Sequence, residues 1–375
     1  GSSSDSASDN LQPTLPPYSY EESDTPIDFD GYEQSATRAA IRENDFENGD
    51  AFGVYAYLKP AEDGSGSNSY PLQNYMENLK VTYSKADGAD SGTWFNSQTK
   101  YWPADTNIKI RFFAYYPVTY GSGASVAAYT ASDDGFPTIT YTPLAMAAYQ
   151  GDFMTAMTDE LYKGHELLYS NGDPANGTYT GVPLSFKHHL TQVKFSANHN
   201  GTDNETVKVT KIVLKGAMGT NTGKFNAGND DADNDGFKWG DVATNETSYT
   251  VSSGFTTGNI INVNDVAVDA ATKYTTLHAT NDAILLLLPQ TPGDGDITLE
   301  VTFEMTLDNG TVIIAMQTFA FPGHTYTEGA GVNYQIPIAV DQVSSIILGS
   351  VTYEAWEEVK NDNDEDEDFY TGTLK

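Results

Sequence analysis

The chain has 375 residues, which is enough for two domains of ordinary size that each bury their own core. Its 19 Lys and Arg residues stand against 52 Asp and Glu residues, and the formal charge of -33 repels nucleic acid and anionic lipid surfaces. The sequence has no Cys, which excludes disulfides, thiolate zinc sites and cysteine nucleophiles. The longest apolar run, Ile284 to Pro289, is far too short to cross a bilayer.

The N-terminal part of the chain predicts a tether followed by a β domain. Residues 1–25 are rich in Ser, Asp and Pro and have almost nothing to bury, so we expect a flexible tether. From residue 26 onward apolar residues recur with period two, which indicates strands. In residues 26–178 we expect strands at Phe52 to Leu58, Leu79 to Ser84, Ile108 to Tyr116, Thr138 to Tyr141 and Phe153 to Thr158. The run Ile108 to Tyr116 is apolar on both faces, which predicts a central strand.

The middle of the chain predicts a domain boundary. Residues 170–183 are rich in Gly, Asn and Pro and form the best linker, so we place the boundary between residues 178 and 179. Just beyond it the apolar parity changes between Leu184 and Ala197. A β-bulge or a short kink near Thr191 explains this change, and one long bent strand is expected.

The second domain is predicted to occupy residues 179–357 and to contain a hairpin. Alternating apolar residues from Ile297 to Leu307 lead through Asp308-Asn309-Gly310, a type I′ turn signal, into Val312 to Phe321. Further strands are expected at Val207 to Leu214 and Tyr334 to Val340. Residues 358–375 carry an acidic run and are predicted to be a solvated tail. No stretch shows a helical stripe, so the expected fold class is all-β, with antiparallel sandwiches.

The catalytic motifs we sought are incomplete or missing, so the sequence predicts that the protein is not an enzyme. There is no G-x-S-x-G elbow and no phosphate-binding Gly-Lys-Ser/Thr loop. His165-Glu166 begins an H-E-x-x-H zinc motif, but Tyr169 stands where the second His is required. His188 and His189 are successive strand residues, so their side chains face opposite sides and do not easily share one ion.

An acidic stretch is the one candidate for ion binding. Asp231, Asp233, Asp235 and Gly236 reproduce the opening of a calcium loop, in which alternate carboxylates converge on the ion. Position twelve of that loop is Val242 instead of the closing Glu. The alternatives are therefore a weak calcium site with irregular ligands and a solvated acidic hairpin loop. No other cofactor is predicted.

Three aromatic residues close together in sequence are the candidate glycan contact. Trp94, Tyr101 and Trp102 fall within nine residues, and clustered aromatic rings can stack on sugars. Aromatic residues in strands also serve as core residues, so that interpretation stays open beside the first.

Four blocks of sequence resemble the fimbrillin-like surface proteins of Bacteroidetes. The first, within residues 37–57, contains Thr-Arg-Ala, then Asn-Asp-Phe-Glu-Asn-Gly-Asp and Phe-Gly-Val-Tyr-Ala-Tyr. The second runs from Lys-Tyr-Trp-Pro at 100–103 to Phe-Phe-Ala-Tyr-Tyr-Pro at 112–117. The third is Leu-Ser-Phe-Lys-His-His-Leu at 184–190 with Val-Lys-Phe at 193–195, and the fourth is Trp356-Glu357. The four blocks occur in the order found in that family.

The resemblance implies a fold, a location and a way of assembling. It implies two transthyretin-like β-sandwich domains in tandem and a lipoprotein precursor exported to the outer membrane and cell surface, held there only through its lipid anchor. It further implies that an arginine-specific cut removes the first strand and that a strand of a neighbouring subunit replaces it. Other fimbrial subunits, in a homo- or hetero-polymer, are the implied partners, together with a host or bacterial surface receptor.

Two regions of this chain match that scheme. Arg38 corresponds to the family's cleavage position and Arg42 is a competing site, whereas the alternative is that both are ordinary surface charges. Near the C-terminus Ile347, Val351, Tyr353 and Ala355 alternate on one face of a candidate donor strand. The alternative is that this strand completes its own domain. The expected function is that of a structural fimbrial subunit that supports adhesion, and the alternative is a monomeric surface lipoprotein that binds glycans.

Overall fold

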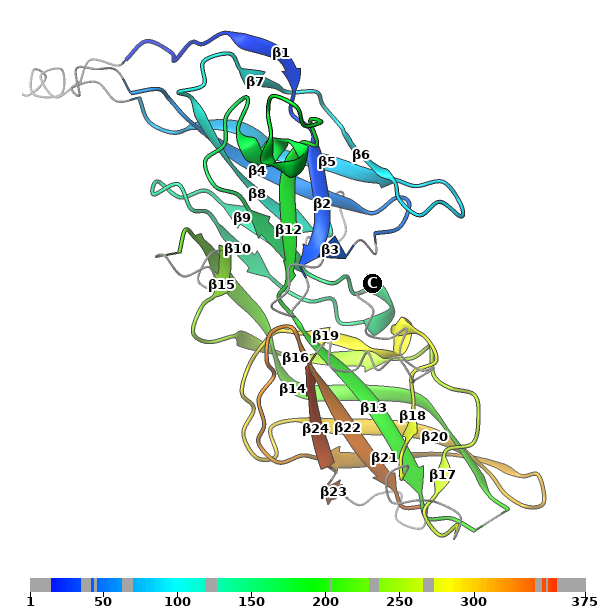
Figure 1. The fold of residues 1–375 in the computed structure, drawn as a ribbon. Helices are drawn as coiled ribbons and strands as arrows, with labels where there is room; N and C mark the ends of the chain where they lie inside the picture. Colours follow the sequence, from blue (N-terminus) through cyan, green and yellow to red (C-terminus); the bar gives the residue numbers. More distant parts are fainter. Residues whose placement is uncertain are drawn as a thin grey trace, which may run out of the picture.

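The structure, a computed structural model, describes residues 15–34, 42–43, 46–62, 70–118, 127–202, 204–228, 236–265, 273–340, 346–348 and 350–355. Within these ranges every regular element is a strand or a short 3-10 turn, which confirms the all-β prediction. The chain forms an elongated body in which β1 to β8 lie at one end and β16 to β24 at the other (Figure 1).

One eight-stranded sheet builds the N-terminal half, in the order β3-β2-β12-β11-β8-β4-β5-β6. Its strands are β2 (Phe29–Gln34), β3 (Arg42–Glu43), β4 (Ala51–Lys59), β5 (Gln73–Ser84), β6 (Thr93–Asn96), β8 (Lys109–Tyr116), β11 (Met154–Met157) and β12 (Val182–His188). A separate pair is formed by β1 (Glu22–Pro26) and β7 (Tyr101–Pro103). The inward side chains of these strands make one core, in which Phe52, Phe112 and Phe186 are fully buried.

The predicted central strand of this half is confirmed. β8 lies between β4 and β11 and pairs with both. Phe112 on one face enters the N-terminal core, and Phe113 on the other face enters a second cluster with Phe225 and Leu286 from the C-terminal half. Both faces of β8 are therefore buried, which is why both faces are apolar.

Two sheets build the C-terminal half around a core of their own. The longer sheet has the order β23-β21-β20-β14-β10-β9, with β15 and β16 also paired to β14, and the second has the order β17-β13-β22-β24, with β18 and β19 also paired to β13. The longer strands are β13 (Thr191–His199), β14 (Thr206–Asn226), β16 (Thr244–Val251), β20 (Thr298–Thr306), β21 (Val312–Ala320) and β22 (Ala330–Ile338). The shorter strands are β9 (Ala127–Thr130), β10 (Thr138–Tyr141), β15 (Gly236–Trp239), β17 (Ile261–Asn262), β18 (Thr275–Thr276), β19 (Leu285–Leu287), β23 (Ile346–Leu348) and β24 (Ser350–Ala355).

The strand β14 links the two halves more closely than the sequence predicted. It was expected to end at Leu214 but extends to Asn226, where it pairs with β10. β10 lies in the range 26–178 assigned to the first domain, yet it belongs to the sheet of the C-terminal half. The region between the halves is consequently filled by a shared apolar cluster.

Two local expectations require correction. The bent strand is two strands, β12 and β13, which separate at His189 and Leu190 and belong to different sheets. Because β12 pairs with β2 and β11, the chain leaves the N-terminal sheet about ten residues beyond the predicted boundary at 178. The β20–β21 hairpin has a Gly310 N–H to Leu307 C=O bond and a positive φ of 83° at Gly310 alone, so its turn is type I followed by a left-handed Gly, not type I′.

A histidine of the C-terminal half makes stability sensitive to acid. Burial, reinforced by the nearby charge of Lys194, lowers the pKa of His278 from 6.5 to about 4. Between these values the unfolded chain binds more protons than the folded chain, so stability falls as the pH drops through that window. Because the side chain is partly exposed to solvent, we expect a loss of only about 1–2 kcal/mol.

Urea unfolding at about pH 7 and about pH 5 measures this dependence. The wild-type protein should lose more stability between the two pH values than the His278→Asn variant does. Equal losses in the two proteins would show that this imidazole does not contribute.

Candidate functional site

The N-terminal segment fills a groove in the first sheet. Along Ile27, Phe29, Gly31 and Glu33 every second residue is buried, and Ile27 and Phe29 are 0% and 5% exposed. The Phe29 ring meets Phe52 and Phe112 edge-on, with ring centroids 6.1 and 5.5 Å apart. The segment thus supplies core side chains to a fold that the rest of the chain builds.

The main chain of this segment is held differently on its two sides. On one side β2 pairs in parallel with β12, with Phe29 opposite Val182 and Gly31 opposite Leu184. On the other side, side chains of β6 make the bonds: Trp94 Nε1 donates to the Gly31 carbonyl at 3.2 Å, and Asn96 Nδ2 donates to the Ile27 carbonyl at 2.7 Å. On this second side the Ile27 N–H also donates to the Lys100 carbonyl, and Glu33 and Gln34 pair with β3, so main-chain bonds reinforce the two side-chain clamps.

The contribution of the N-terminal segment to the free energy of unfolding can be measured in the intact protein. Phe29→Ala removes a buried ring and leaves a cavity, and we expect a loss of about 3–5 kcal/mol in the free energy of unfolding. Asp28→Ala is the matched control, because Asp28 is exposed and next in sequence. Urea unfolding should separate the two variants, and similar stabilities would mean that the segment contributes little to this core.

The far end of the segment carries a buried carboxyl group. Glu33 is 1% exposed, and its Oε1 lies 4.0 Å from His188 Nε2. The other ring nitrogen, His188 Nδ1, lies 2.5 Å from the Asp152 carboxylate, which is also buried. One imidazole thus stands between two buried acidic side chains, one of which belongs to the N-terminal segment.

The predicted cleavage residues lie next to this segment. Arg42 is in β3, whose backbone pairs antiparallel with β2, and Arg38 lies outside the described residues between the two strands. A cut at Arg38 would therefore separate β1 and β2 from every later strand of the chain. Chain connectivity after that cut would no longer hold β2 in the groove.

The predicted donor residues occupy two strands, not one. Ile347 is in β23, which runs parallel to β21, whereas Val351, Tyr353 and Ala355 are in β24, which runs antiparallel to β22. β23 and β24 each form the end of their sheet among the described strands. In this monomer both strands pair within their own half, and either can leave without separating two other strands.

The candidate glycan contact does not form an exposed platform. Trp102 is fully buried and its Nε1 donates to the Tyr179 hydroxyl at 2.8 Å. Trp94 packs between Phe46 and Phe52, with centroid distances of 4.8 and 4.7 Å. Since Trp102 has no exposed face, it serves as core, and Trp102→Ala would report on folding instead of sugar binding.

The histidine motifs have structural surroundings. His165 Nδ1 accepts the Leu167 N–H at the start of a 3-10 turn. His189 is fully buried, and its two nitrogens lie against Thr155 and Glu328. Among the described residues no group of three His, Asp or Glu side chains is arranged to hold a metal ion. Asp231, Asp233 and Asp235 lie outside the described residues, and calcium binding there stays a prediction.

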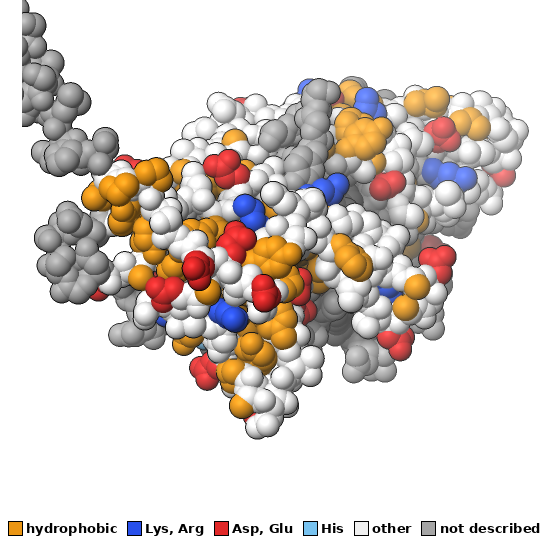
Figure 2. Space-filling view, turned by 90° about the horizontal axis from the view of Figure 1, so that it is seen from above, with side chains coloured by type: hydrophobic (Ala, Val, Ile, Leu, Met, Phe, Trp, Pro, Cys, Tyr) orange, Lys and Arg blue, Asp and Glu red, His pale blue; other side chains and the backbone are white. Residues whose placement is uncertain are grey.

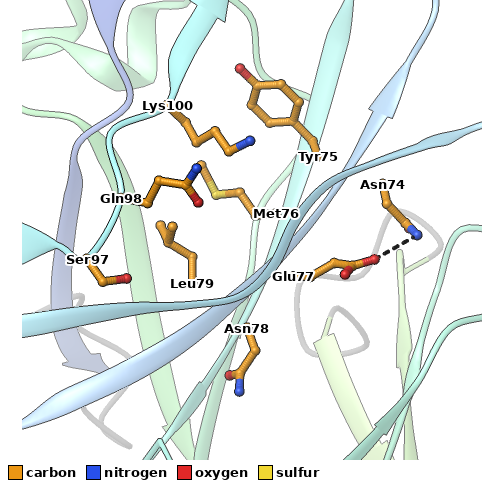
Figure 3. A pocket seen from close by; sticks show the side chains of 9 residues that line it. All are labelled: Asn74, Tyr75, Met76, Glu77, Asn78, Leu79, Ser97, Gln98 and Lys100. Carbon is orange, nitrogen blue, oxygen red and sulfur yellow. Dashed lines mark hydrogen bonds between the residues drawn. The ribbon is translucent and has the colours of Figure 1, made fainter.

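A polar hollow of about 510 Å³ lies beside β5 (Figure 3). Asn74, Glu77, Asn78, Gln98 and Lys100 contribute to its lining. Several of these groups bond within the protein: Asn74 Nδ2 donates to Glu77 Oε1, and Asn78 Oδ1 accepts the hydroxyl of Tyr115. The lining contains no paired nucleophile and base, so the hollow does not form a recognisable catalytic site.

Sequence reasoning missed the residues that shape the groove. Trp94 and Asn96 were not recognised as clamps because their partners are carbonyl groups about 60 to 70 residues away in the chain. Gly31 was not singled out, although a side chain at this position would crowd the rings of Phe52, Phe186 and Trp94. The only available signal was a Gly in an otherwise alternating strand, which often marks a close approach.

The fold defines an all-β, multi-sheet protein in which segments near both ends of the chain form strands at or near sheet ends. The profile of the fimbrillin-like family matches residues 37–356, and the chain belongs to that family. Among curated proteins no significant match is found.

Two solved structures are similar to this chain. A fimbrial protein from Bacteroides vulgatus is 20% identical and has a TM-score of 0.54, with 88% of this chain and 99% of that chain covered. A proposed cell adhesion protein from Bacteroides ovatus is 15% identical over 90% of this chain and 99% of that chain, with a TM-score of 0.43. The first of these two similarities supports the fold.

Proposed function

We propose that the protein is a structural subunit of a bacterial surface fimbria and that it polymerises by strand exchange after proteolysis. An arginine-specific cut at Arg38, or at Arg42, releases the N-terminal segment, and a C-terminal strand of the next subunit takes its place. The observation that carries this proposal is the N-terminal segment itself, whose side chains Ile27 and Phe29 are buried in a core built by later strands.

An emptied groove gives the driving force for assembly. Loss of the segment exposes the rings of Phe52 and Phe112 and one edge of β12 to water. A strand from another subunit restores both the main-chain bonds and the apolar contacts, which is recognition by β-augmentation. Burial of about four side chains contributes on the order of 6–10 kcal/mol, so exchange is tight and slow to reverse.

The C-terminal strands are the donor in this proposal. β23 and β24 lie at the ends of their sheets, so each loses main-chain pairing on one side only when it moves to a neighbouring subunit. The transfer exchanges intramolecular pairing for intermolecular pairing and links subunits head to tail, which generates an open filament.

The proposed setting is the cell surface, with a lipid anchor on the precursor as the membrane attachment. No helix in the described part of the chain is long and apolar enough to cross a membrane. Figure 2 shows hydrophobic patches between scattered acidic and basic side chains on the coloured part of one face. Other subunits are the primary partners in this scheme, and adhesion to a surface receptor is the biological output.

Cleavage of the pure protein by an arginine-specific protease tests the proposal. Multimers that withstand denaturant are the expected product, because each inserted strand completes a core. A cleaved protein that stays monomeric at high concentration contradicts the proposal.

A further inference from the structure

The groove that β2 occupies leaves little room for a side chain at one position, that of Gly31. A Cβ atom built on Gly31 would lie 3.1 Å from a ring carbon of Phe52 and 3.3 Å from ring carbons of Phe186 and Trp94. These distances are shorter than the 3.4–4 Å of ordinary contact, so a side chain there forces packed rings to move. Glycine is therefore the residue that fits this point without any movement of the rings.

The C-terminal segment contains one glycine that suits this position. Gly349 is the only glycine between residues 340 and 357, and Ile347 and Val351 stand two positions away on either side of it. In an extended strand these three residues face the same side. Placing Gly349 at the position of Gly31 therefore turns two apolar side chains into the groove.

Two strand directions are compatible with that placement, and burial distinguishes between them. A strand parallel to β12 puts Ser345 at the site of Ile27, which is fully buried and apolar. An antiparallel strand puts the large, mostly apolar side chain of Tyr353 there.

The antiparallel direction also suits the other two sites. It puts Val351 at the site of Phe29 and Ile347 at the site of Glu33. Every inward position then receives an apolar side chain or the required glycine. Antiparallel pairing is in addition slightly more stable per residue than parallel pairing.

We propose that residues 347–353 of a second copy fill the place of β2 antiparallel to β12, with Gly349 at the position of Gly31. The inference rests on the proposed strand exchange and adds its register and its direction. Exchange replaces a parallel ladder by an antiparallel one and the buried carboxyl of Glu33 by the side chain of Ile347. The antiparallel ladder favours the polymer over the uncleaved monomer.

Engineered cysteines test the direction, since the chain has no Cys of its own. Ser185 lies opposite Tyr32 on the outward side of β12. In the antiparallel arrangement that place is taken by residue 348, and in the parallel arrangement by residue 350. Directly opposed residues in an antiparallel pair come within disulfide range.

The experiment mixes full-length copies carrying Ser185→Cys with copies carrying either Leu348→Cys or Ser350→Cys. Each mixture is cleaved with an arginine-specific protease and oxidised, and the linked peptides are identified by mass spectrometry. The expected result is that a disulfide forms between residues 185 and 348 and that none forms between residues 185 and 350. A dominant 185–350 link would show that the inserted strand runs parallel to β12. Multimers that form with neither link would show that residues 347–353 do not fill the groove. Failure of unmodified copies to form multimers overturns the proposed function together with this inference.

A second pair of variants tests the register. Gly349→Val should abolish multimers after cleavage, because its side chain meets the rings of the groove, and thermal unfolding of the uncleaved variant checks that it is folded. Phe52→Leu in the acceptor copies enlarges the space beside the Gly31 position. These acceptors should therefore restore multimers with the Gly349→Val donor. Normal assembly of Gly349→Val without the second change would show that Gly349 does not occupy the Gly31 position.

Discussion

Cleavage by an arginine-specific protease should convert the monomer into a ladder of multimers that survive denaturant. The chain contains only Arg38, Arg42 and Arg111, so such a protease has few places to act. Arg111 lies on the central strand β8, where its guanidinium stacks 5.1 Å from the Phe136 ring and donates to the Thr158 carbonyl. Cleavage should therefore occur before β4 and leave the rest of the fold whole.

A pair of substitutions controls for this result. The Arg38→Ala, Arg42→Ala double variant should resist cleavage and remain monomeric, because the segment stays covalently attached and seated. Arg111→Lys is the matched variant, since it removes the remaining arginine and keeps the charge near Glu160. It should cleave and polymerise like wild type. Gel electrophoresis without boiling reads out all three proteins, and multimers from the double variant would contradict the role of the cut.

Removal of residues 344–375 should abolish polymerisation after cleavage and leave an active acceptor. The deletion takes away β23 and β24, which the proposal assigns as the donor, whereas the N-terminal groove and its core are untouched. Added in excess to cleaved full-length protein, the shortened protein should cap growing ends and shift the ladder toward short multimers. We expect near-complete loss of self-assembly, because one missing strand removes on the order of 6–10 kcal/mol of burial per junction.

The matched control is deletion of residues 358–375 alone. That change removes the acidic tail and keeps every residue of β23 and β24, so polymerisation should continue. Circular dichroism and thermal unfolding should first show that both shortened proteins remain folded. Undiminished polymerisation of the 344–375 deletion would rule out the C-terminal donor.

The strands that local alternation specifies were predictable, whereas those that distant contacts specify were not. The two apolar faces of β8 gave its central position, because Phe112 and Phe113 each face a core. The second half of β14 has no such pattern. A Cβ on Gly223 would lie 2.0 Å from the Phe237 ring, so a glycine that suggests a loop is in fact required by the packing of β15 across it.

The candidate site shows the same division. The burial of Ile27 and Phe29 follows a local alternation of apolar residues, and β2 begins at Phe29. The donor segment was expected as one strand, yet its residues divide between β23 and β24 because two different sheets offer edges for pairing. The aromatic trio looked suitable for sugar stacking, but the bond from Trp102 to Tyr179 depends on a residue 77 positions later. Sequence spacing alone did not reveal that contact.

Native mass spectrometry of the cleaved protein tests the central claim most directly. The account predicts multimers built from chains that begin after Arg38 or Arg42, with the N-terminal peptide absent from every multimer. Multimers that retain one N-terminal peptide per subunit, or a cleaved monomer that keeps its peptide and never associates, would contradict it.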